Sequence, residues 1–196
     1  SDAQANKTNT QLKAFLLTRV SDYSLASIAN ETIEASKGNA NAFMEAATVE
    51  IDGAIESATR SLAIACFGDG SGAIGQVLST TSSVATFTLK ETDDVTNFEV
   101  GMQIKLNANK TGNSTTLSAA LIVDGVDRDS GLITISTSAT VTADHFIYQE
   151  GDYDAKLKGL NAWLPESAPG STDSFFGVNR SADATRLGGI RFDGSS

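Results

Sequence analysis

The sequence predicts an α+β protein in which a long helix packs on a sheet and a small antiparallel β-barrel or sandwich is inserted. Two patterns predict this fold class. Apolar residues within 41–67 recur at steps of three and four, as on one face of an α-helix. From residue 74 the period falls to two, which is the period of a half-buried strand. A chain of 196 residues, 40% of them hydrophobic, is long enough for one domain with an insert.

Two short helices are expected before residue 40. Apolar residues between 12 and 20 have helical spacing, and those between 25 and 33 repeat at three and four. The stretch 21–24 indicates a turn or a helix cap between the two helices. Lys37 and Gly38 suit the end of the second helix, where a cation and a glycine are favoured.

Residues 41–67 predict the dominant element of the chain. A helix of roughly 25 residues is about 38 Å long, over twice the average for globular proteins. Its acidic residues fall mostly off the apolar stripe. We expect four side chains of the stripe to fasten the helix to its sheet, namely Phe43, Ile51, Ile55 and Leu62. Replacing Ile55 with Asp is therefore expected to abolish soluble folding.

The helix is expected to stop in a glycine turn. Gly68, Gly70 and Gly72 follow the last apolar position and can redirect the chain, since glycine tolerates the left-handed backbone of helix ends. A phosphate-binding loop would instead follow a strand, open a helix and end in Lys-Ser or Lys-Thr. The pattern here has the opposite order and no such lysine, so a helix cap with a tight turn is favoured.

The segment 76–155 predicts about five antiparallel strands. Strict alternation over 98–106 gives the clearest strand, and the runs 121–126 and 132–136 flank a short glycine-ended loop typical of a hairpin. The run 146–148 adds a last strand. Five strands are enough to close a small barrel or sandwich.

These elements suggest three domains or segments. Residues 1–75 form the helical part of the core, 76–155 an inserted β-rich domain, and 156–196 a return segment. The apolar clusters after residue 156 are too short to be stable alone and are expected to pack on the first part. Both ends of the sequence look like cuts through a longer polypeptide, so we expect the return segment to be truncated.

The composition argues against several function classes. A net charge of -10 disfavours sequence-specific nucleic-acid binding, because phosphate contacts need clustered Lys and Arg. The same sign disfavours an anionic membrane surface, and no apolar run reaches the roughly 18 residues of a membrane span. No membrane partner is therefore expected.

Catalytic chemistry is not evident in the sequence. His145 is the single histidine and Cys66 the single cysteine, so a His- or Cys-based metal site lacks ligands. A role for His145 beside Asp144 in a triad would need a nucleophile placed by the fold. Asp69 with Asp93 and Asp94 lacks the alternating ligands of a calcium loop. We expect no enzyme activity, no catalytic residue, no metal and no cofactor.

Several phrases resemble one family of viral proteins. The residues 19–30, the long helix, and the run from Ala65-Cys-Phe-Gly-Asp-Gly-Ser-Gly to Gly75 are similar to major capsid proteins of tailed bacteriophages, which have the Hong Kong 97-type fold. The later runs 159–165 and 176–181 look like phrases from a prophage branch of that family. The resemblance covers about residues 19–75 and 157–192, while the β-rich block lies outside the minimal family fold.

The resemblance implies a structural function. It implies a major capsid subunit that self-assembles into an icosahedral shell around double-stranded DNA, in a virion formed in a bacterial cytoplasm. Its partners would be copies of itself and other virion proteins. The alternative is a phage tail, baseplate or surface-adhesin binding module whose β-rich domain faces the ligand. A small hydrolase is a third hypothesis, disfavoured by the scarcity of His and Cys.

Overall fold

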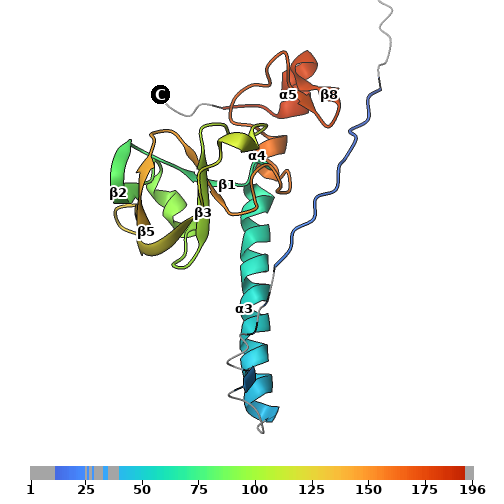
Figure 1. Cartoon of the computed structure of the whole chain (residues 1–196). Helices are drawn as coiled ribbons and strands as arrows, with labels where there is room; N and C mark the ends of the chain where they lie inside the picture. The colour runs from blue at the N-terminus through green and yellow to red at the C-terminus, as the bar shows by residue number, and fades with distance from the viewer. Residues whose placement is uncertain (1–11, 25, 27, 29–32, 35–39, 193–196) are drawn as a thin grey trace, which may run out of the picture. The chain divides into compact units, whose positions relative to one another are not determined.

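The computed structural model describes residues 12–24, 26, 28, 33–34 and 40–192. The chain divides into two compact units (Figure 1). Unit 1 joins Ser1–Arg19 to Trp163–Ser196, and unit 2 is Val20–Ala162. The long helix and the β-sheet therefore belong to the same unit. The expected boundary between residues 75 and 76 falls inside a strand of that sheet.

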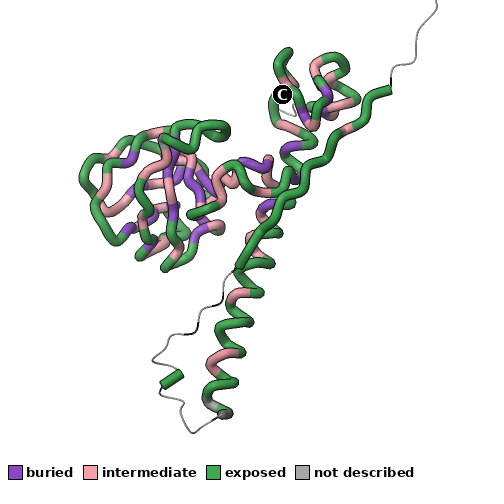
Figure 2. The backbone as a smooth tube through the Cα atoms, turned by 45° about the vertical axis from the view of Figure 1, so that its right-hand side comes forward, coloured by how far each residue is buried: buried purple, intermediate pink, exposed green. Residues whose placement is uncertain are grey.

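Helix α3 (Ala40–Phe67) has 28 residues and begins one residue before the predicted start. It ends where the amide of Gly68 donates to the carbonyl oxygens of Ile64 (3.0 Å) and Ala65 (3.1 Å). Ala65 is buried, but most of the helix is exposed along its length (Figure 2). The last turns of α3 thus carry its contacts with the strands.

Six antiparallel strands form one sheet in unit 2, in the order β1-β6-β3-β4-β5-β2. The short 3-10 helices η1 (Thr92–Asn97) and η2 (Ser114–Thr116) lie between the strands. The strands are β1 (Ala73–Gln76), β2 (Thr81–Thr88), β3 (Gln103–Asn107), β4 (Leu121–Asp127), β5 (Leu132–Val141) and β6 (Phe146–Gln149).

The sheet curls without closing a barrel. Its two edge strands meet at their ends, where Val77 and Leu89 form an isolated antiparallel bridge. Inward-facing side chains of the strands and of η1 make the core. Its fully buried members include Val77, Phe87, Leu89, Phe98, Ile104, Val123, Ile133, Ile135, Val141 and Ile147. The α+β class is therefore confirmed, whereas the closed barrel is not.

The predicted strand over 98–106 is shorter in the structure. Strand β3 covers only Gln103–Asn107, because a turn precedes it in which the amide of Met102 donates to the carbonyl of Glu99 at 3.2 Å. Gly101 has a φ of +89°, which favours glycine. The predicted hairpin is present as β4 and β5, and the amide of Gly131 donates to the carbonyl of Asp127 at 3.0 Å in its turn.

Unit 1 contains only short elements: β7 (Ser174–Phe175), β8 (Val178–Asn179), η3 (Arg180–Asp183) and α5 (Ala184–Gly188). Helix α4 (Leu160–Trp163) reaches it from unit 2. Its core is a set of aromatic rings. Trp163 and Phe175 pack edge to face with centroids 4.8 Å apart, and the guanidinium of Arg180 lies 4.1 Å from the centroid of Phe175.

The prediction of a helix over 12–20 is wrong, since this segment is extended (Figure 1). One ring and one backbone amide of this segment contact other residues of unit 1. Phe15 packs against Trp163 with centroids 5.4 Å apart, and the amide of Leu16 donates to the carbonyl of Phe176 at 2.9 Å. No turn is assigned at 21–24. The expected helix over 25–33 falls mostly outside the described residues, although Ile33 and Glu34 are helical.

Candidate functional site

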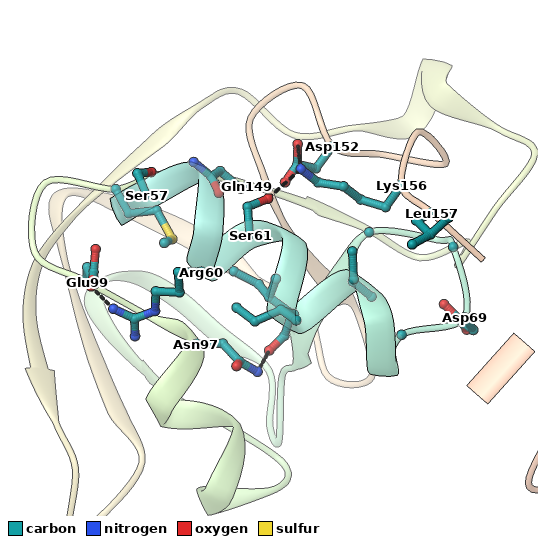
Figure 3. A pocket seen from close by; sticks show the side chains of 18 of the residues that line it. Ser57, Arg60, Ser61, Asp69, Asn97, Glu99, Gln149, Asp152, Lys156 and Leu157 are labelled. Carbon is teal, nitrogen blue, oxygen red and sulfur yellow. Dashed lines mark hydrogen bonds and ion pairs between the residues drawn. The ribbon is translucent and has the colours of Figure 1, made fainter. Parts of the chain in front are cut away.

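A pocket of about 250 Å³ lies in unit 2 between the last turns of α3 and the sheet (Figure 3). Ile64, Ala65, Ile74, Met102 and Leu157 give it an apolar lining. Polar groups from the helix, from the segment before β3, from the end of β6 and from the loop after β6 complete it. They include Ser57, Arg60, Ser61, Asn97, Glu99, Gln149, Asp152 and Lys156.

Lys156 is the centre of a hydrogen-bond network beside the pocket. Its Nζ donates to Asp22 Oδ2 at 2.7 Å, to Ser61 Oγ at 2.7 Å and to Asp152 Oδ1 at 3.0 Å. Ser61 Oγ in turn donates to Asp22 Oδ2 at 3.2 Å. The hydroxyl of Ser24 donates to the carbonyl of Ala54 at 3.0 Å. The network therefore ties the 22–24 segment and the loop after β6 to α3.

The protonation of this network follows from its burial and its hydrogen bonds. Burial opposes the charge of Lys156, but the carboxylates of Asp22 and Asp152 outweigh it, so the pKa of this amine is raised. The hydrogen bond from Lys156 is the main reason why the pKa of Asp22 is lowered. Burial raises the pKa of Asp152 despite its contact with Lys156.

This arrangement is suited to holding segments together rather than to nucleophilic chemistry. A lysine that acts as a nucleophile or base needs a lowered pKa. Lys156 has the opposite shift and both its carboxylate partners are in place. Across the pocket Arg60 pairs with Glu99 and donates to the carbonyl of Thr96. Both cations at the pocket are thus occupied by the protein itself.

The glycine turn borders the same pocket. Its three glycines differ in how much room a side chain would have. Gly70 and Gly72 have φ values of +91° and +79°. A Cβ on Gly72 would lie 2.1 Å from the carbonyl oxygen of Asp152. A Cβ on Gly68 would meet ordinary contacts at 3.5 Å. The turn is also fixed by Asp69, which accepts from the amide and hydroxyl of Ser71 at 3.0 and 2.6 Å.

The four helix residues expected to fasten α3 to the sheet do not do so. Phe43 is 37% exposed, Ile51 50%, Ile55 59% and Leu62 53%. Apart from Ile64 in its last turns, the described positions of α3 that are buried or half-buried carry small or polar side chains, such as Ala47, Ala54, Ser61 and Ala65. The apolar stripe exists, but periodicity alone does not say which surface covers it.

His145 and Asp144 are not arranged as members of a triad. Asp144 Oδ1 accepts from Lys90 Nζ at 2.6 Å instead of binding the imidazole. The main chain of His145 is used in the sheet region, where its carbonyl accepts from the amide of Val77 at 2.9 Å. Asp69, considered above for calcium, pairs with Lys110 at 2.7 Å. Where the chain is described, no three His, Cys, Asp or Glu residues gather as a possible metal site.

Sequence reasoning did not find the Lys156 network. Asp152 and Lys156 are four residues apart, a spacing that suits an ion pair on a helical turn and could have signalled this part of it. The contact of Lys156 with Asp22 joins residues 134 positions apart, and only the fold brings them together.

Within the described ranges, no helix combines the length and apolar character that crossing a bilayer requires. Neither the known protein families nor the curated proteins compared with this sequence give a match.

Proposed function

We propose that the chain is a structural subunit of a viral shell, namely a major capsid protein of a tailed bacteriophage or prophage with a Hong Kong 97-type fold. In this proposal α3 is the long spine helix and the strands from residue 76 onward are an inserted module. Copies of the chain associate, together with other virion proteins, into an icosahedral shell around double-stranded DNA.

The observation that carries the proposal is the exposed apolar surface of α3. Helices of single-chain globular proteins bury their apolar stripe against their own core. Here Met44, Ile51, Ile55 and Leu62 are all half or more exposed in one chain. Contiguous exposed apolar surface on a rigid element is typical of a protein–protein contact. A subunit that becomes complete only in an assembly has this property.

The pocket supports a structural function as well. Its lysine and arginine are paired with carboxylates, and the network connects three segments of unit 2. Such a joint stiffens the end of a long helix, which suits a protein that bears load. Each contact between copies can be weak, because closure of many symmetric contacts makes the shell stable. The acidic net charge suits an inner wall that does not bind the enclosed DNA.

Electron microscopy tests the proposal directly. The full-length gene product is expected to elute far ahead of a monomer in size-exclusion chromatography and to show closed shells in negative stain. A folded product that stays monomeric at every concentration would refute the proposal. Genes for a terminase, a portal and a maturation protease directly upstream would support it.

One observation speaks for the alternative of a ligand-binding module in a tail, baseplate or adhesin. A pocket of about 220 Å³ in the β-rich part includes Tyr148 and Tyr153, whose rings pack at 5.0 Å. Both hydroxyls are engaged with the loop after β3, since Tyr148 donates to the carbonyl of Asn109 and Tyr153 accepts from the amide of Asn113. Retention of the chain on a glycan array would favour this alternative.

A further inference from the structure

The outer surface of α3 combines apolar and acidic side chains. We define the α3 stripe as Met44, Ile51, Ile55 and Leu62, which are half or more exposed and lie on one side of the helix at steps of seven and four. Along one edge of this stripe lie three exposed carboxylates, those of Glu45, Asp52 and Glu56. No Lys or Arg occurs between residues 40 and 59.

The extended segment 12–20, called the arm here, has the complementary composition. It contains two cations, Lys13 and Arg19, and no acidic residue. Leu12, Leu16 and Leu17 are 93%, 71% and 69% exposed. Only the ring of Phe15 is partly buried, in the aromatic core of unit 1. The arm can therefore present apolar and basic side chains to another molecule while the ring of Phe15 stays in the core of unit 1.

The two surfaces agree in length as well as in charge. The α3 stripe runs from residue 44 to residue 62, which is about 27 Å along a helix axis. Nine extended residues span about 27–30 Å. Among the residues the structure describes, the two arm cations and the three stripe carboxylates take part in no ion pair. Both surfaces thus have charge available for a partner.

A second α3 is a poorer occupant of the stripe than the arm. Two such helices packed antiparallel would bring their carboxylate edges together, and like charges facing each other weaken association. The arm brings apolar side chains and opposite charge. Because each copy carries one arm and one stripe, contacts from copy to copy can run head-to-tail and close into rings.

We propose that the arm of one copy of this chain binds along the α3 stripe of a second copy. Lys13 and Arg19 face the carboxylates of Glu45, Asp52 and Glu56, and the arm leucines cover the stripe. This inference rests on the proposed function as a self-assembling subunit and names one of its contacts.

Charge reversal with mixing tests this contact. The arm variant K13E/R19E and the helix variant D52K/E56K each place like charges on both surfaces of the same chain. Each variant alone is expected to self-associate at least about tenfold more weakly than the unaltered chain in analytical ultracentrifugation. An equimolar mixture restores opposite charges in both directions between unlike copies. The mixture is expected to recover affinity to within about threefold of the unaltered chain.

Two controls separate the contact from general charge effects. The variant D124K/D129K raises the net charge as much as D52K/E56K does, at exposed positions of the β-rich part, and is expected to associate like the unaltered chain. The variant K13R/R19K keeps the arm charge and is expected to do the same. Far-ultraviolet circular dichroism establishes that every variant is folded.

The outcomes distinguish this contact from the proposed function. If the unaltered chain assembles and the reversed variants assemble equally well, or if mixing restores nothing, the arm–stripe contact is refuted while the shell proposal stands. If the unaltered chain does not self-associate, both are refuted. Weak association of each variant with recovery on mixing supports the contact, and shows that it joins different copies.

Discussion

At the scale of single residues, two glycines show how the nearby backbone determines whether a side chain can be accommodated. Gly72 and Gly151 both have positive φ, +79° and +93°. A Cβ on Gly72 would meet the carbonyl of Asp152, whereas a Cβ on Gly151 would meet nothing within 4 Å. The two positions therefore separate backbone strain from steric contact.

Replacing Gly72 with Ala is expected to destabilise the protein by at least about 3 kcal/mol, since left-handed strain of about 1–2 kcal/mol adds to a clash with main-chain atoms. Gly151→Ala is the matched control, and its loss of stability should come from backbone strain alone. Urea unfolding of both variants measures the difference. Equal losses would mean that the turn can move away from the loop after β6.

Asp22 offers a pH-dependent test of the Lys156 network. Its folded pKa is lowered, chiefly by the hydrogen bond from Lys156, so its contribution to stability is present above its ordinary pKa of 3.8. That contribution disappears as the pH falls through the folded pKa. Asp22→Asn is thus expected to lose about 0.5–1 kcal/mol at pH 6, since Asp22 is half exposed.

As the pH falls through the lowered folded pKa of Asp22, the loss from Asp22→Asn is expected to shrink toward zero, because the carboxyl becomes neutral in the unaltered protein too. Unfolding free energies of both proteins across pH 2.5–6 measure this trend. Asp152 has a raised pKa and remains in both proteins, so its titration largely cancels in the difference. A loss that is the same at every pH would show that the carboxylate does not hold the 22–24 segment.

At the scale of elements, α3 shows what a hydrophobic period establishes. The spacing predicts the helix and its stripe, and the structure has a helix from Ala40 to Phe67. The inference that the stripe packs against the chain's own sheet is wrong for Phe43, Ile51, Ile55 and Leu62. Ala47 and Ala54, which have small side chains, are half-buried instead. An amphipathic pattern indicates that a face is covered, not which molecule covers it.

The exposure of Ile55 reverses the expected effect of Ile55→Asp. With 59% of the residue exposed, the variant is expected to keep its circular dichroism spectrum and lose less than about 1 kcal/mol of stability. Its self-association should weaken, because a charge replaces an apolar contact. Ile104→Asp, at a fully buried position of β3, is the comparison that should unfold. An Ile55→Asp variant that fails to fold would restore the original expectation.

At the scale of the whole molecule, the two units differ in their cores. Among the described residues, the buried hydrophobic side chains of unit 1 are only Phe175 and Val178, whereas unit 2 has the buried faces of six strands. The chain has one tryptophan, Trp163, and it lies in the aromatic cluster of unit 1. Tryptophan fluorescence therefore reports on unit 1, and helical circular dichroism reports mainly on α3.

The unfolding transitions measured by tryptophan fluorescence and by circular dichroism are expected to occur at different urea concentrations. A smaller core buries less apolar surface, so the fluorescence transition in urea should fall at lower denaturant than the circular dichroism transition at 222 nm. Arg180→Lys, which loses part of the planar contact with Asp173 and Phe175, should shift only the fluorescence transition. Superimposable curves would mean that the units unfold as one.

Part of the candidate site could be predicted from local features of the sequence. The turn after α3 could be placed from Gly68, Gly70 and Gly72, because helix ends and left-handed turns leave local marks. The Lys156 network could not, since Asp22 and Lys156 are joined by a contact of long sequence separation between ordinary surface residue types. His145 was a poor candidate by residue type, and in the structure Asp144 pairs with Lys90 instead.

The sequence by itself determined the elements whose signals are local: the long helix, its glycine end, the β4–β5 hairpin and the α+β class. Their causes are hydrogen bonding and side-chain periodicity within a few residues. The tertiary structure alone decided that residues 12–20 are extended, that the sheet stays open and that most large apolar side chains of α3 remain exposed. Each of these depends on which distant surface offers the larger burial, and no spacing along the chain records that.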